Sequence, residues 1–139
     1  MTQVIIDNGV SQSDFTELDL SRFLQLKSLS VGDHCFSYVN EVKLIGLSEL
    51  ESVEIGMNSF TKFKNTWQIT SDPNCHFYLK SCPKLKSLKM GCFSFSDYTV
   101  CEIESVNALE VIEMGKLNET SKNFRSASLE LKSILIHRE

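Results

Sequence analysis

The chain has 139 residues, and its 18 acidic and 14 basic side chains give a formal net charge of −4 at pH 7. Hydrophobic residues make up 42% and charged residues 23%, which fits one folded domain and excludes a disordered chain. Non-specific nucleic-acid binding needs clustered positive charge, and the sequence contains no such cluster.

The start of the chain, Met-Thr-Gln-Val-Ile-Ile-Asp, has neither the basic nor the apolar stretch of a signal peptide. No apolar run approaches the about 18 residues that indicate a transmembrane helix. The five cysteines are odd in number and contain no CxxC pair, which fits reduced thiols better than a disulfide framework. We therefore expect a cytoplasmic protein, with an irregular N-terminal part at residues 1–17 ahead of a repeated region at 18–136.

A short phrase recurs along the chain: a leucine, two residues, an aliphatic residue, one residue, an aliphatic residue and a glycine. Four copies start at Leu26, Leu50, Leu85 and Leu109, and a fifth without the glycine occupies 131–136. The two aliphatic positions lie two residues apart, which predicts a strand with both side chains on one face. Because the glycines are spaced by 24, 35 and 24 residues, the period predicts a solenoid.

The second half of each unit is apolar at regular positions too. A phenylalanine comes first, at Phe36, Phe60 and Phe95. An alternating apolar pair follows, as in Val42 and Leu44, and it favours a second short strand over a loop or a 3₁₀ turn. Helical periodicity is weak, so we expect little α-helix. One unit cannot bury these residues alone, and stacking of neighbours would form the core.

The segment Leu50–Phe60 reads LxxVxIxxNxF and matches the leucine-rich repeat consensus. The chain resembles the leucine-rich repeat proteins, and most of all the irregular BspA-like branch, through Ile55–Phe60 (IGMNSF) and Cys82–Met90 (CPKLKSLKM). The resemblance implies a mainly β leucine-rich-repeat solenoid that fills residues 1–139 as a single domain. It would have about five units of about 24 residues, a parallel sheet on one face and little α-helix.

Outward positions of the predicted strands alternate in charge from copy to copy. The position after the leucine reads Lys27, Glu51, Lys86, Glu110 and Lys132. Opposite charges on adjacent strands stabilise a stack, so we expect these side chains to pair with one another rather than to bind a ligand.

The glycine that ends each phrase predicts either a positive φ or a close approach of two backbones. A phosphate-binding loop would need further glycines and a helix.

The 35-residue interval contains an insertion at residues 61–76, between the second and third units. Insertions in solenoids often form the binding face. We therefore predict a partner-binding patch with Trp67 as its anchor, made of Lys62, Phe63, Lys64, Trp67 and His76. The alternative is that Phe63 and Trp67 pad the convex side and that the loop is merely tolerated.

Catalytic and metal-binding chemistry has little support in the sequence. Cys35 follows His34 and His76 follows Cys75, but adjacent side chains of extended backbone point to opposite faces. Metal binding by Cys75, His76 and Cys82 would lack the spacing of a zinc site. We expect no enzymatic activity, no cofactor and no metal. The chain is interpreted as a protein-interaction module whose partner is a protein, not nucleic acid or a membrane.

The alternative function is structural. The apolar segments 4–6 and 134–136 indicate terminal strands without a cap, and open sheet edges invite pairing with other chains. The chain would then be part of a longer repeat array, or a unit that assembles end to end, of the kind found in surface adhesins.

Overall fold

The computed structural model describes residues 2–61, 72–91, 94–95, 98–114 and 128–132. This part of the chain holds ten strands and no helix. Sheet A contains β1 (Gln3–Ile6), β3 (Ser28–Val31), β5 (Ser52–Ile55), β7 (Ser87–Met90) and β9 (Val111–Met114). Sheet B contains β2 (Glu17–Asp19), β4 (Glu41–Ile45), β6 (Asp72–Lys80), β8 (Tyr98–Glu104) and β10 (Ser128–Lys132).

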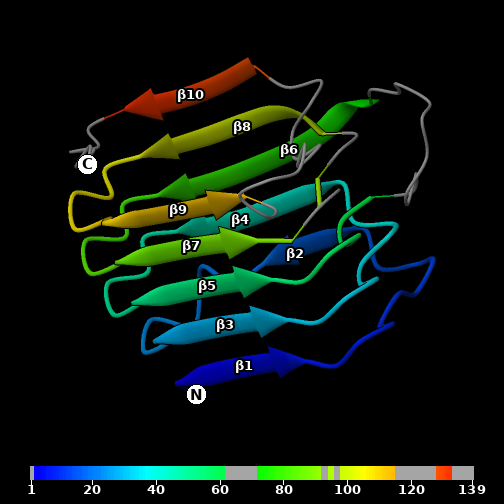
Figure 1. Ribbon diagram of the computed structural model, residues 1–139, viewed down its shortest axis with the longest axis horizontal. Coiled ribbons are helices and arrows are strands. Elements are labelled where there is room, and N and C mark those ends of the chain that lie inside the picture. Colours follow the sequence, from blue (N-terminus) through cyan, green and yellow to red (C-terminus); the bar gives the residue numbers. More distant parts are fainter. Residues whose placement is uncertain (1, 62–71, 92–93, 96–97, 115–127, 133–139) are drawn as a thin grey trace.

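Consecutive strands alternate between the two sheets, and every neighbouring pair within a sheet is parallel. Figure 1 shows sheet A in front with its arrows to the right, and sheet B behind with its arrows to the left. We call one strand of sheet A and the next strand of sheet B a rung. The mainly β character, the parallel pairing and the second strand of each unit are confirmed. The alternating pair Val42 and Leu44 forms β4, and these second strands pair with one another in a parallel sheet of their own.

Both ends of the repeated region differ from the prediction. Residues 3–6 form β1, within the segment 1–17 that we expected to be irregular, and β1 pairs with β3. The copy at 131–136 was predicted to lie in the same sheet as the other copies. Instead, Lys132 ends β10 in sheet B, opposite Glu104, because Leu129 and Leu131 take the register of the alternating pair in β8.

The core lies between the inner faces of the two sheets. Side chains two residues apart on each inner strand are buried, as the period-two pattern predicted: Leu29, Val31, Val53, Ile55, Leu88 and Met90 from sheet A, and Val42, Leu44, Phe77, Leu79, Cys101 and Ile103 from sheet B. The leucines that open the phrases are buried between the sheets as well: Leu26, Leu50, Leu85 and Leu109.

A column of phenylalanines runs through the rungs at one end of the core. The ring centroids of Phe36 and Phe60 are 5.2 Å apart, and those of Phe60 and Phe95 are 4.6 Å apart with the rings nearly parallel. Phe15 extends the column, 5.5 Å from Phe36. Phe36, Phe60 and Phe95 all have φ between 56° and 59°, a region that bulky residues rarely adopt. Packing within the column therefore offsets the backbone strain.

The glycines after the sheet A strands allow neighbouring backbones to approach closely. A Cβ on Gly56 would lie 2.5 Å from the carbonyl carbon of Gly32, and one on Gly91 would lie 2.5 Å from the nitrogen of Met57. A Cβ on Gly32 would lie 2.7 Å from the backbone nitrogen of Asn8. Positive φ among the described glycines occurs at Gly9 and Gly46 instead. Of the two reasons predicted for the phrase glycines, close approach is therefore the one that applies.

Side chains satisfy the carbonyl groups at this close approach. The Ser59 hydroxyl donates to the carbonyl of Gly32 at 2.8 Å, and the Ser94 hydroxyl donates to that of Gly56 at 2.5 Å. In the preceding rung the Cys35 thiol donates to the carbonyl of Asp7 at 3.1 Å. The same bond therefore recurs at three successive rung junctions.

Replacing Ser59 with alanine is expected to lower the free energy of unfolding by about 1–3 kcal/mol. The Ser59 hydroxyl is buried and also accepts a bond from the Cys35 nitrogen at 3.2 Å, so its loss leaves a buried donor and a partly buried acceptor unpaired. Urea denaturation measures the change. The control, Ser30→Ala on the outer face of β3, should stay within about 0.5 kcal/mol of the unsubstituted chain. Equal stability of the two variants would contradict the assignment.

Candidate functional site

The outward side chains of sheet B form a continuous surface, which we call the outer face of sheet B. Inward residues of β4, β6 and β8 are buried, so their neighbours point outward and are partly exposed. The face consists of Glu17, Asp19, Glu41, Lys43, Ile45, His76, Tyr78, Lys80, Val100, Glu102 and Glu104.

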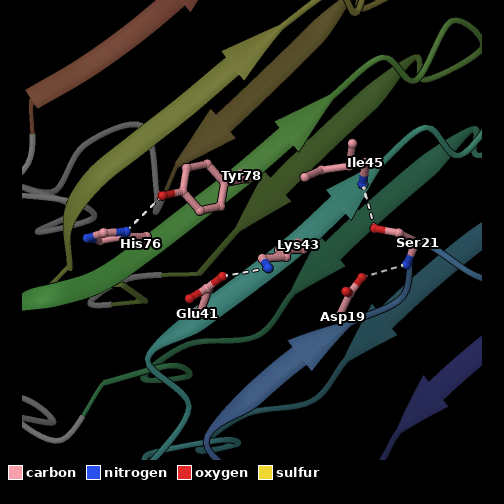
Figure 2. A network of polar contacts seen from close by, with 7 residues as sticks. All are labelled: Asp19, Ser21, Glu41, Lys43, Ile45, His76 and Tyr78. Atoms are coloured by element: carbon pink, nitrogen blue, oxygen red, sulfur yellow. Dashed lines mark hydrogen bonds and ion pairs between the residues drawn. The ribbon is translucent and has the colours of Figure 1, made fainter.

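Tyr78 lies at the centre of the outer face of sheet B. In the sheet register it is flanked by Lys43 on β4 and by Glu102 on β8. Its hydroxyl and the His76 Nδ1 form a hydrogen bond of 2.8 Å, and the two rings meet edge to face (Figure 2). The Lys80 ammonium lies 5.2 Å from the centroid of the Tyr78 ring, within reach of a cation–π attraction. The tyrosine is therefore held by His76 and Lys80, the neighbouring outward residues of its own strand.

Charged side chains around Tyr78 are paired. Lys43 and Glu41 are 2.9 Å apart, and Lys80 and Glu102 are 3.2 Å apart (Figure 2 shows the first pair). All four side chains are between 26% and 33% exposed, so each pair contributes at most about 1 kcal/mol of stability. Their effect is to order the surface around the aromatic ring rather than to hold the fold together.

The edge of this surface is ordered by bonds to Ser21. The backbone nitrogen of Ser21 donates to the Asp19 carboxylate at 2.9 Å, and that bond lowers the pKa of Asp19. The Ser21 hydroxyl accepts from the nitrogen of Ile45 at 3.3 Å (Figure 2). Ser21, which follows β2, therefore links the Asp19 carboxylate of β2 to the Ile45 backbone of β4 by hydrogen bonds.

The environment of Tyr78 keeps its phenol in the neutral form. Burial raises the pKa of the phenol, and the carboxylates of Glu102 and Glu41 raise it further. Tyr78 is therefore a neutral phenol at physiological pH. It can donate and accept hydrogen bonds, but it is not activated as a nucleophile.

The predicted partner-binding residues are only partly covered by the structure. Lys62, Phe63, Lys64 and Trp67 lie outside the described residues. His76 is placed on β6, on the outer face of sheet B, where it bonds Tyr78.

Tyr78, the central residue of this face, was not predicted from the sequence. A usable signal was present, because Phe77 and Leu79 form an alternating apolar pair and must point inward. The same alternation places His76, Tyr78 and Lys80 together on the opposite face of a parallel strand.

The outer face of sheet A has the predicted arrangement of charges. The backbone nitrogen of Glu51 donates to the carbonyl of Lys27 at 2.7 Å, and Lys86 and Glu110 continue the series, each at 2.9 Å from the carbonyl before it. Lysine and glutamate therefore alternate on adjacent strands in these four rungs, and all four side chains are exposed. The fifth member, Lys132, was assigned wrongly, because it belongs to sheet B.

The described thiols are buried. These are Cys35, Cys75, Cys82 and Cys101, whereas His34, beside Cys35 in the sequence, is exposed. Burial raises the pKa of the Cys82 thiol and raises that of Cys101 to about 12. Among the residues with described positions, no group of three or more His, Cys, Asp or Glu side chains could hold a metal ion.

Alkylation of the native protein is expected to spare Cys82 and Cys101. At about pH 8, a pKa of about 12 in place of 9.0 lowers the thiolate fraction of Cys101 roughly a thousandfold, and burial also blocks access. Iodoacetamide treatment followed by peptide mass mapping measures the modification of each residue, with the denatured chain as the fully reactive control. Rapid labelling of either residue in the folded protein would contradict its burial.

Comparison of the chain with protein-family models, with curated proteins and with solved structures finds no match. Within the described segments, no helix has the length and the apolar character needed to cross a membrane.

Proposed function

We propose that the chain is a leucine-rich-repeat solenoid that acts as a non-catalytic protein-interaction module and binds its partner through the outer face of sheet B. The observation that carries this proposal is the environment of Tyr78. A partly buried aromatic ring lies at the centre of a sheet face, and ion pairs surround it. Protein interfaces typically have a central aromatic anchor and a polar rim. Parallel sheets are also usually covered on both faces.

The predicted insertion supports the same location. It leads directly into β6, the strand that carries His76 and Tyr78. In this proposal Trp67 is a second anchor, with Phe63, Lys62 and Lys64 contributing. A loop that precedes a rigid strand can add contacts to the surface which that strand presents.

The charge of the outer face of sheet B indicates the kind of partner. Its acidic residues are Glu17, Asp19, Glu41, Glu102 and Glu104, and its basic residues are Lys43 and Lys80, so the net charge is 2 − 5 = −3. Complementary charge accelerates association and excludes partners of the same sign. The partner surface should therefore have a basic rim around an apolar or aromatic centre.

Replacing Tyr78 with alanine is expected to weaken partner binding at least about thirtyfold, which corresponds to the loss of about 2 kcal/mol at an aromatic hot spot. The matched control is Tyr38→Ala, because Tyr38 is 44% exposed but lies outside this face. Affinity capture compares the two variants with the unsubstituted chain, and titration of the captured protein gives the dissociation constants.

A deletion of residues 62–71 distinguishes the contribution of the insertion from that of the outer face of sheet B. Loss of capture on deletion, with Tyr78→Ala unaffected, would place the site in the insertion alone. Capture that survives both changes, with unaltered thermal melting, would overturn the proposal.

A further inference from the structure

The end rungs expose residues that correspond to core positions. Ile112 on β9 stands opposite Leu88, which is fully buried, yet Ile112 is 37% exposed. At the other end, Phe15 completes the phenylalanine column and is 38% exposed, and Val4 and Ile6 on β1 are only partly buried against the core. In the described part of the chain, β1 and β9 are the two edges of sheet A.

Backbone hydrogen bonds between rungs run in both directions along the stack. The nitrogens of Gly32, Gly56 and Gly91 donate to the carbonyls of Ile6, Val31 and Ile55 in the preceding rung at 2.8–2.9 Å. Other nitrogens donate to the following rung, such as that of Gly46 to the carbonyl of Lys80 at 2.9 Å. Each rung therefore presents both donors and acceptors to its neighbours, as parallel pairing requires.

The hydrogen bonds that β1 and β9 make within sheet A determine which of their backbone N–H and C=O groups point to the outer edges. The carbonyls of Thr2 and Ile6 accept bonds from the second rung, so the backbone nitrogens of Gln3 and Ile5 are directed to the outer edge of β1. On β9 the nitrogen of Val111 bonds the carbonyl of Lys86, so the carbonyl of Ile112 is directed to the opposite edge. Because the N–H and C=O of one strand residue point to the same side, each edge presents both donors and acceptors, and the two edges can pair in the parallel register of the stack.

The residue columns are compatible across such a junction. If a first rung followed a fifth rung in the prevailing register, Val4 and Ile6 would continue the columns of Ile112 and Met114. In sheet B, Leu18 would likewise continue a column that includes Leu129. Neither β1 nor β9 contains a lysine or a proline, the residues that commonly protect an exposed edge.

We propose that β1 of one copy pairs in parallel with β9 of a second copy, so that the protein associates head to tail. The contact is heterologous, because the two copies use different edges. A chain of copies therefore continues beyond a dimer unless its rotation closes a ring. This association uses the ends of the stack, and it is independent of partner binding on the outer face of sheet B.

Two edge variants test the proposal. Ile5→Pro removes a backbone donor that bonds no carbonyl of the described residues, at an edge position where proline is tolerated. Ile112→Lys places a charge at the exposed end of the core. Multi-angle light scattering over a range of concentrations should show the unsubstituted chain rising past twice the monomer mass of 15.8 kDa, and each variant remaining a monomer. Ile5→Thr, which keeps the backbone donor, should still assemble.

An equimolar mixture of the two variants gives the decisive result. Ile5→Pro retains a free β9 edge and Ile112→Lys retains a free β1 edge, so the mixture should form a dimer that grows no further. Monomeric behaviour of the unsubstituted chain, a closed dimer of it, or a mixture that stays monomeric would each overturn the proposal. Circular dichroism melts confirm that each variant is folded. If Ile112→Lys unfolds, Ile112→Pro takes its place, because the Ile112 nitrogen is also directed to the edge.

Discussion

Replacement of Gly56 by alanine is expected to lower the free energy of unfolding by about 3 kcal/mol. The new Cβ would lie 2.5 Å from both the carbonyl carbon and the carbonyl oxygen of Gly32, and 2.3 Å from Asp33 Oδ1. Backbone atoms cannot rotate away as a side chain can, so β3 and β5 must separate locally. This would also disturb the bond from the Gly56 nitrogen to the carbonyl of Val31. Urea denaturation gives the free-energy change.

Gly46→Ala is the control for the effect of close approach. A Cβ at Gly46 has no heavy atom within 4 Å, but its φ is +71°, so alanine should cost only about 1–2 kcal/mol of backbone strain. The difference between the two variants isolates the contact between rungs. If Gly56→Ala were no less stable than Gly46→Ala, the strands would be able to separate without cost and the close approach would have no structural role.

Replacement of Phe60 by alanine is expected to lower the free energy of unfolding by about 3–5 kcal/mol. Phe60 is 1% exposed and lies between Phe36 and Phe95 in the column. Its removal leaves a cavity that both neighbouring rungs share, and the cavity cannot collapse without shifting two parallel strands. Chemical denaturation measures the loss, and the denaturant slope should remain unchanged.

Phe15→Ala provides the comparison within the same column. Phe15 is 38% exposed and contacts Phe36 from one side, so its loss should cost about 1 kcal/mol. Similar losses for the two variants would show that the column does not transmit packing from rung to rung.

The sequence could predict the elements whose spacing is local. Alternating pairs such as Val53 and Ile55 identified the inner faces, because side chains two residues apart on a strand lie on the same face. The segment that forms β1 was not identified as a copy of the phrase, since Asp7 follows it where a glycine follows the other copies. β10 was assigned to the wrong sheet because Leu131 fits two overlapping patterns, and only the pairing with β8 decides between them.

The candidate site was predictable only in part, for a related reason. The insertion directed attention to His76, and the structure places it beside Tyr78. The surroundings of Tyr78 come from three strands, and Lys43 and Glu102 become its neighbours only through the sheet register. A single sequence does not state that register. The consensus residue Asn58 shows the same limit: it is buried, but its side-chain amide has no hydrogen-bond partner in the described residues.

The constant register of the rungs also determines how the molecule opens. Each strand pairs only with the strand before it and the strand after it in its own sheet. Opening an end rung breaks one interface, whereas opening β5 or β7 breaks two, so the free energy of local opening rises from both ends toward the middle. Amide hydrogens of the central strands should then exchange most slowly, and unfolding should begin at the same edges that would otherwise recruit a second copy.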